Sequence, residues 1–389
     1  MRQSDRSDAA GVVPAYGRTD LALEAHEALF GRAGAVGAET APKAAAPDVE
    51  AGLRKETEEA FGGRMRVVRL EIVSEAAAQA LGKPVGKYVT FELPELLTGE
   101  AAYRSEAADL FSRGLARFFK EIGLGDEDPV LVVGLGNRQV TPDALGPVVA
   151  ERVRVTRHLF QHEPGLVEDG VRSVAALAPG VMGTTGVETG DIVAAVVGAI
   201  GVAAVIVVDA LAARSLARLY TTVQMSDAGI QPGSGIGNKR RPLTRETLGV
   251  PVIAIGVPTV VEASTIAGEA IDLLIKHLGR QLHEASQPKA RERLVPPGAP
   301  PYDRPPRFTE ADLPPEPARK VFFGLLGTLT EEEKQALLRE VLEPLGMNWI
   351  VTPKEVDAYI DDLGQFLAAG LNRALHGRID RENVAHFTH

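Results

Sequence analysis

Two aspartates follow apolar, strand-like runs and are the side chains of this sequence best placed to do chemistry. Asp143 comes after the run Val130–Val133 and a glycine-containing turn, and Asp209 closes the run Val205–Val208. Ligands bind to open α/β sheets at the carboxyl ends of the parallel strands. Two carboxylates that meet at that edge can share a proton for acid and base catalysis, can bind a metal, or can only cap helices.

The local sequence gives the two carboxylates different expected surroundings. Thr141-Pro142-Asp143 is typical of a helix start, which would place Asp143 near the positive end of a helix dipole. Asp209 follows four β-branched residues, so its backbone is expected at the carboxyl end of a strand. Either aspartate alone fits a structural role, and the two at equivalent strand ends favour a functional site.

Nucleotide and phosphate motifs are incomplete. A dinucleotide fingerprint that starts at Gly134 would need a third glycine where Gln139 stands, and a phosphate loop that starts at Gly233 would need glycine in place of Asn238. The second cluster is therefore interpreted as a shaped substrate loop. Its residues expected to bind substrate are Gly233, Ser234, Gly235 and Asn238.

Hydrolase and zinc motifs are also missing. The sequence has neither the G-x-S-x-G of a serine hydrolase nor the H-E-x-x-H of a zinc peptidase. His158 and His162 are four residues apart and could share a helical face, but they lack an acidic partner nearby. We expect surface histidines and no bound metal or cofactor, with His158 as the fallback ligand.

Composition excludes several classes of protein. The 389 residues are 45% hydrophobic and 24% charged, as in ordinary globular proteins, and include no cysteine, which rules out disulfides and thiolate chemistry. A cytosolic-type compartment is favoured. The net charge of −10, without a dominant basic tract, argues against direct nucleic-acid binding. No apolar run is long enough to cross a membrane, and the polar start Met1–Asp8 is not a secretory signal.

Strand-like and helix-like runs alternate across residues 128–283. Such alternation predicts an α/β fold, with a mostly parallel twisted sheet flanked by helices. The strands are expected at 129–135, 204–208 and 250–257, and the helices at 142–158, 191–199 and 265–282. Extra strands are expected at 64–72 and 88–93, and an amphipathic helix at 106–122. The long segment 209–249 is rich in Gly, Ser and Thr and is expected to be a functional loop.

The segments before and after this central region differ from it in composition. Residues 1–17 are polar without an apolar period, and residues 288–317 are rich in proline, as in a linker. Beyond the linker, Thr330 and Thr352 begin sequences typical of capping boxes. We expect a C-terminal helical appendage over residues 330–376 that packs on the core.

Several long motifs resemble the germination protease family of spore-forming bacteria. The resemblance covers nearly the whole chain. It is carried by the segments 18–25, 81–86, 134–138 with 141–147, 208–215, 221–229, 231–238 and 345–349.

The resemblance implies an endoprotease of the spore core that degrades small acid-soluble spore proteins during germination. Such proteases are made as self-processing zymogens and are homotetramers, with a core similar to that of hydrogenase-maturation proteases. The catalytic aspartates of the family fall on Asp143 and Asp209, and the propeptide would end at Ala15–Tyr16. Residues 1–15 would then be the propeptide and 16–389 a single protease domain.

A physical mechanism accompanies the resemblance. Two adjacent carboxyls that share one proton can activate water and protonate the leaving amine. The helix start favours charged Asp143 as the base, and apolar neighbours favour protonated Asp209, in a pair that titrates as a unit. The alternatives are a metal-dependent peptidase that uses Asp143, Asp209 and His158, or a metal-binding or scaffold protein without enzymatic activity.

Overall fold

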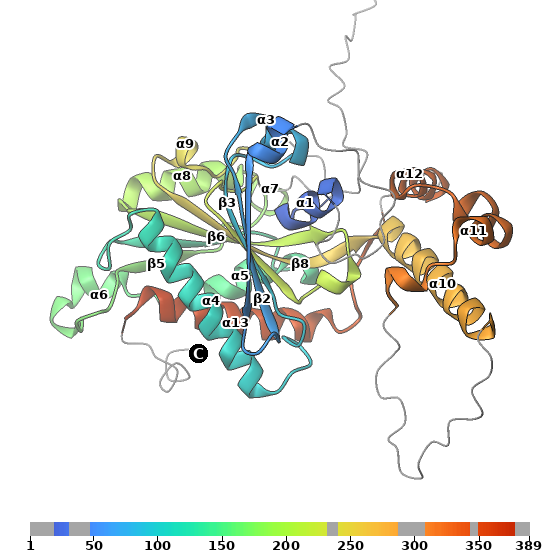
Figure 1. Cartoon of the computed structure of the whole chain (residues 1–389). Helices are drawn as coiled ribbons and strands as arrows, with labels where there is room; N and C mark the ends of the chain where they lie inside the picture. The colour runs from blue at the N-terminus through green and yellow to red at the C-terminus, as the bar shows by residue number, and fades with distance from the viewer. Residues whose placement is uncertain (1–18, 31–46, 232–239, 287–307, 343–348, 378–389) are drawn as a thin grey trace, which may run out of the picture. The chain divides into compact units, whose positions relative to one another are not determined.

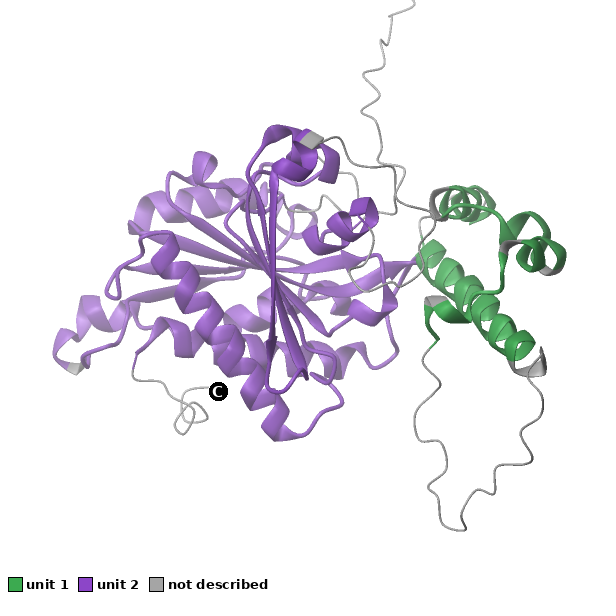
Figure 2. Cartoon of the chain, in the orientation of Figure 1, with its two compact units in different colours: residues 1–17, 31–41, 263–349 green, residues 18–30, 42–262, 350–389 purple. Residues whose placement is uncertain are grey.

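The chain folds into two compact units. The computed structural model describes residues 19–30, 47–231, 240–286, 308–342 and 349–377 (Figure 1). Unit 1 is centred on residues 263–349 (Figure 2). Unit 2 comprises residues 18–30, 42–262 and 350–389 and contains the whole sheet and both aspartates. The boundary between a propeptide 1–15 and one protease domain 16–389 stays a prediction.

Unit 2 is built on one mixed sheet. In the described part of the chain its order is β1-β2-β3-β7-β8-β6-β4-β5, with β9 paired to β8. The neighbours β5, β4, β6 and β8 are parallel, and the remaining pairs are antiparallel. The bounds are β1 (Leu53–Ala60), β2 (Met65–Ile72), β3 (Gly86–Glu92), β4 (Val130–Gly134), β5 (Val174–Leu177), β6 (Ala204–Ala213), β7 (Thr222–Ser226), β8 (Val252–Glu262) and β9 (Ile350–Val351).

The central strands are buried on both faces, which explains their unbroken apolar sequence. In β6, Ile206 and Val208 lie in one buried cluster, while Val205 and Val207 lie in another. Parallel strands covered on both faces have this near-continuous apolar pattern. The α/β fold with a mostly parallel core, predicted from the alternating runs, is confirmed.

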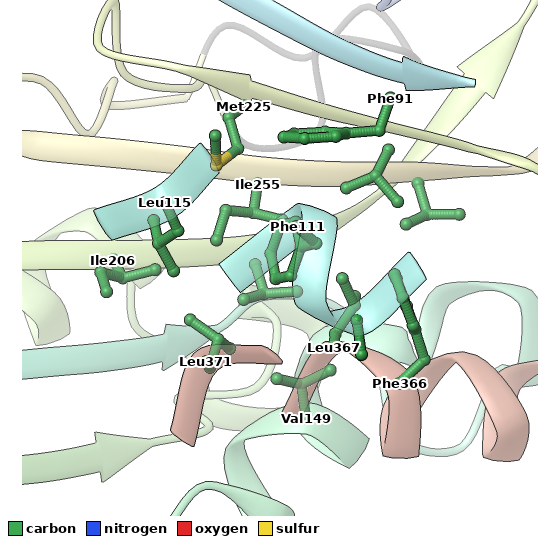
Figure 3. Close-up of a cluster of buried hydrophobic side chains, with 14 of the residues drawn as sticks. Phe91, Phe111, Leu115, Val149, Ile206, Met225, Ile255, Phe366, Leu367 and Leu371 are labelled. Carbon is green, nitrogen blue, oxygen red and sulfur yellow. The ribbon is translucent and has the colours of Figure 1, made fainter. Parts of the chain in front are cut away.

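Helices from distant parts of the sequence cover one face of the sheet. They are α4 (Ala101–Glu121), α5 (Leu145–Arg152) and the C-terminal α13 (Val356–Leu375). Figure 3 shows Phe111 of α4 among Phe366 and Leu371 of α13, with Ile206 of β6 in the same cluster. Helix α8 (Thr189–Ile200) contributes Val193 and Val197 to the cluster on the other face. Because α13 supplies so much of the first cluster, this helix belongs to the core of unit 2.

Shorter helices complete unit 2. Near the N-terminus, α1 and α3 contribute to a third buried cluster with side chains of β2 and β3. No helix among the described residues is long and apolar enough to span a membrane. The bounds of these helices are α1 (Ala22–Phe30), α2 (Pro47–Ala51), α3 (Glu75–Leu81), α6 (Arg157–His162), α7 (Met182–Thr185) and α9 (Arg245–Leu248).

The described part of unit 1 is helical. It contains α10 (Ala263–Ser286), α11 (Glu316–Phe323) and α12 (Glu331–Leu342). Arg280 of α10 donates two 2.7 Å hydrogen bonds to the Asp312 carboxylate, which fixes the segment before α11. The capping box predicted at Thr330 is present, because its N–H donates to Glu333 and its hydroxyl accepts the N–H of Glu333.

Three local expectations differ from the structure. The helix predicted over 142–158 ends at Arg152, because Thr156 N–H donates to the Val174 carbonyl beside β5 instead of continuing a helix. Thr352 does not cap α13, which begins at Val356, and its hydroxyl donates to the Thr259 carbonyl. The segment 209–249 is not one long loop, since it holds the end of β6, the short strand β7 and α9.

Candidate active site

Asp143 lies in a tight turn between β4 and α5. It ends the 3-10 helix η1 (Thr141–Asp143), and its Oδ2 accepts the N–H of Asn137 at 2.7 Å. The Thr259 hydroxyl of β8 donates to the Pro142 carbonyl at 2.7 Å, although the two residues are far apart in sequence. These contacts attach the turn to the sheet immediately beside Asp143.

Asp209 is the first residue of β6 beyond the end of β4. The two strands pair up to Gly134 and Val208, and the N–H of Leu135 then donates to the Val208 carbonyl at 2.8 Å. The Asp209 carboxylate accepts the N–H of Ala210 at 2.9 Å. The sequence predicted that the strand before Asp209 ends there, but β6 continues to Ala213. The strand that ends beside Asp209 is the neighbouring β4.

Three glycines let the turn approach β6 closely. A Cβ at Gly136, whose φ is +115°, would lie 1.9 Å from the Asp143 carbonyl oxygen. A Cβ at Gly134 would lie 2.0 Å from the carbonyl oxygen of Gly146. A Cβ at Gly146 would lie 2.2 Å from the Leu135 carbonyl oxygen and 2.5 Å from that of Val208. These glycines therefore serve backbone packing that brings the two aspartates to one place.

The two carboxylates interact electrostatically. Burial raises the pKa of Asp209 well above its usual value, and the charge of Asp143 raises it further. Burial also raises the pKa of Asp143, while the Asn137 N–H and the positive charge of Arg240 lower it. Both residues are intermediate in exposure. The arrangement therefore favours a proton on Asp209 beside a less basic Asp143.

The charged form of Asp143 is stabilised differently from the expectation. The helix predicted to begin at Thr141 begins there only as a 3-10 turn, and α5 starts at Leu145. The sequence predicted that the dipole of an α-helix would stabilise the charged Asp143. In the structure the Asp143 carboxylate instead accepts a hydrogen bond from the N–H of Asn137, at the start of the turn.

Of the other predicted site residues, only His158 lies in the described part of the chain, and it is not among the groups that act on the pair. His158 is exposed on α6, and the described residues contain no group of three or more His, Asp or Glu side chains that could hold a metal ion. The remaining predicted positions lie outside the described residues: Ala15, Tyr16, Gly233, Ser234, Gly235 and Asn238.

Sequence reasoning missed three residues around the pair. Asp20 and Arg240 both act electrostatically on Asp209, and Thr259 holds the Asp143 turn. The only available signal was for Asp20, which lies in one of the motifs that carried the family resemblance. Arg240 and Thr259 belong to no motif, and only the folded chain places them.

Comparisons with known proteins show which family the chain resembles over its length. A family model described as "Germination protease" matches residues 22–388. The germination protease of Bacillus cereus (strain G9842) is 45% identical over 372 residues, which is 96% of this chain and 97% of the relative. That of Bacillus cytotoxicus is 46% identical with the same coverage.

One solved structure is also similar in part. It is the [NiFe] hydrogenase maturation protease HycI from Thermococcus kodakarensis, which is 19% identical and covers 38% of this chain and 80% of its own. The TM-score is 0.24, so this likeness adds nothing to the fold described above.

The glycine packing predicts the effect of a single methyl group. Gly146→Ala places a Cβ against two backbone carbonyls, so we expect the free energy of unfolding to fall by about 1–3 kcal/mol. The matched control is Gly198→Ala in α8, where no atom lies within 4 Å of the added Cβ and stability should rise by up to about 1 kcal/mol. Urea denaturation measures both. Equal stability of the two variants would contradict the packing argument.

Proposed function

The chain belongs to the germination protease family and is a protease, and we propose that it starts the degradation of small acid-soluble spore proteins with Asp143 and Asp209 as its catalytic pair. The observation that carries the pair is the packing of the turn after β4 against the Val208 carbonyl of β6, next to Asp209, and the charge of Asp143 raises the pKa of Asp209 across this junction. Two carboxylates with separated proton affinities are what acid and base catalysis of peptide hydrolysis needs.

The proposed mechanism keeps one proton on the pair. Asp143 takes a proton from a water molecule as the water oxygen bonds to the peptide carbonyl carbon. Asp209 gives its proton to the leaving nitrogen as the C–N bond breaks. Asp143 then holds the proton and Asp209 is charged, and a proton exchange between them restores the starting state. No metal or cofactor is required in this scheme.

The substrate is proposed to bind along the segment that follows β7. The ends of this segment are held by two backbone hydrogen bonds between Ile230 and Leu243, of 3.0 and 2.8 Å. Arg240, near its end, acts on both aspartates electrostatically. Both facts support a substrate role for the segment between Ile230 and Leu243. The residues proposed to contact the substrate are Gly233, Ser234, Gly235 and Asn238.

We also propose that the protein is made as a zymogen in the spore core and removes its own residues 1–15 by cleaving the bond between Ala15 and Tyr16. It is also proposed to be a homotetramer. Unit 1 supports the second proposal, because it exposes a set of large apolar side chains suited to an interface with another copy. They are Leu273, Leu274, Val321, Leu325 and Val341. A monomer mass by light scattering would contradict the tetramer.

The catalytic pair is tested by removing one charge at a time. Asp143→Asn and Asp209→Asn should each reduce cleavage of a purified small acid-soluble spore protein at least about 100-fold. The control is Asp169→Asn, an exposed aspartate away from the pair, which should cleave like the wild type. Cleavage is followed by gel electrophoresis, and circular dichroism checks that each variant is folded.

Two outcomes would overturn this assignment. Full activity in either Asn variant would remove that aspartate from the mechanism. Loss of wild-type activity in a chelator, with recovery on adding a divalent metal, would favour the metal-dependent alternative.

The zymogen proposal has a direct test. A chain that starts at Tyr16 should cleave spore protein without a lag, whereas the full chain should first shorten itself at Ala15–Tyr16. Mass spectrometry of the full chain over time identifies the new N-terminus. A different cut site, or further shortening of the Tyr16 chain before it becomes active, would move the proposed boundary.

A further inference from the structure

The edge of β6 beyond the end of β4 is closed by the chain's N-terminal segment. The N–H of Leu135 donates to the Val208 carbonyl of β6. Four residues further along β6, at Ala212, the edge of the strand binds Asp20. The N–H of Ala212 donates to Asp20 Oδ2 at 2.9 Å, and the N–H of Asp20 donates to the Ala212 carbonyl at 3.1 Å. One residue thus satisfies both backbone groups of Ala212, as a neighbouring strand would.

Asp20 is itself held in place by polar contacts from two other elements. Gln224 of β7 accepts the N–H of Ala22 at 2.7 Å and donates to the Asp20 carbonyl at 3.2 Å. The Lys83 ammonium donates to the Thr19 carbonyl at 2.8 Å. These contacts fix the backbone on both sides of Asp20, so its carboxylate has a defined position relative to β6.

The segment after Asp20 is anchored more deeply. Leu21 and Leu23 are fully buried, and the Glu24 carboxylate accepts the N–H of Arg214 at 2.7 Å, just past the end of β6. Arg218 forms ion pairs with Glu24 and with Glu27 of α1, at 3.5 and 2.9 Å. The whole segment is therefore part of the folded core of unit 2, and Asp20 cannot leave β6 without disrupting it.

We propose that Asp20 is a positioning residue for the catalytic pair, because it clamps the edge of β6 three residues after Asp209 and places a third carboxylate at Ala212 of the same strand. This inference rests on the proposed function, since it assigns Asp20 an effect on the proposed acid. Asp20 touches no reacting atom in this scheme. It acts through Asp209, by fixing the strand that carries Asp209 and by opposing its ionisation.

The charges that face Asp209 come from three places. Asp143 faces it from η1, Asp20 from the segment before α1, and Arg240 from the segment before Leu243, while Gly256 is its uncharged partner on β8. Burial is the largest cause of the raised pKa of Asp209, and the charges of Asp143 and Asp20 add to it. Arg240 and the Ala210 N–H act in the opposite direction. Removing the charge of Asp20 should therefore let Asp209 lose its proton at lower pH.

The pH profile of kcat/KM tests this effect. Asp20→Asn keeps an oxygen that can accept the Ala212 N–H but removes the charge, so the alkaline limb should move to lower pH. Glu27→Gln is the matched control, because it removes a charge from the same segment that is not among those acting on Asp209. Its alkaline limb should stay in place. An unmoved limb in Asp20→Asn, or an equal shift in both variants, would overturn the proposal.

A double-mutant cycle tests the same electrostatic interaction without a measurement of activity. The free energy of unfolding in urea is measured for the wild type, Asp20→Asn, Asp209→Asn and the double variant at about pH 5 and about pH 9. We expect a coupling that grows with pH, since Asp209 repels Asp20 only when ionised. Additive effects at both pH values would overturn the proposal. A coupling in a protein that cleaves no spore protein would instead contradict the proposed function alone.

Discussion

The site depends on one close approach, between the turn after β4 and the edge of β6. Leu135 donates to the Val208 carbonyl where β4 ends, and Gly146 packs against the same carbonyl. A side chain at Gly134, Gly136 or Gly146 would clash with the neighbouring backbone and hold the two segments apart. Everything else about the pair follows from this contact, because it places Asp143 beside the first residue of β6 that no longer has β4 as a neighbour.

Bringing two carboxylates together in this way costs stability at neutral pH. Asp209 and Asp143 both have raised pKa values in the folded chain, mainly through burial. A raised pKa means that the folded state binds protons more tightly than the unfolded state, so stability is lost as the pH rises through that pKa. The buried clusters on both faces of the sheet, including the one closed by α13, supply the apolar burial that offsets this cost.

The two ends of unit 2 in the sequence both contribute to its core. In the segment before and within α1, Asp20 binds β6 and Glu24 pairs with Arg218. The helix α13, late in the sequence, packs with α4 and α5 in the buried cluster on one face of the sheet. The surroundings of the two aspartates therefore include residues from outside the central region 128–283. Asp20, from near the start of the chain, binds β6 at Ala212 and adds to the electrostatic surroundings of Asp209.

The sequence by itself determined the α/β fold and the candidate aspartates. The apolar runs at Val130–Val133 and Val205–Val208 predicted buried parallel strands, because strands covered on both faces need no polar residues. Long motifs that include Asp143 and Asp209 indicated the family. Such features are local, so they can be recognised from neighbouring residues in the chain.

Only the tertiary structure decided what surrounds those aspartates. The continuation of β6 past Asp209 and the short strand β7 were hidden in a segment with the composition of a loop. Thr259, Arg240 and Asp20 act on the pair from three separate parts of the chain. No local pattern indicates this for Thr259 or Arg240, and the motif that contains Asp20 does not say what Asp20 acts on. Burial and repulsion between charges depend on distances across the sheet, and those distances exist only once the chain has folded.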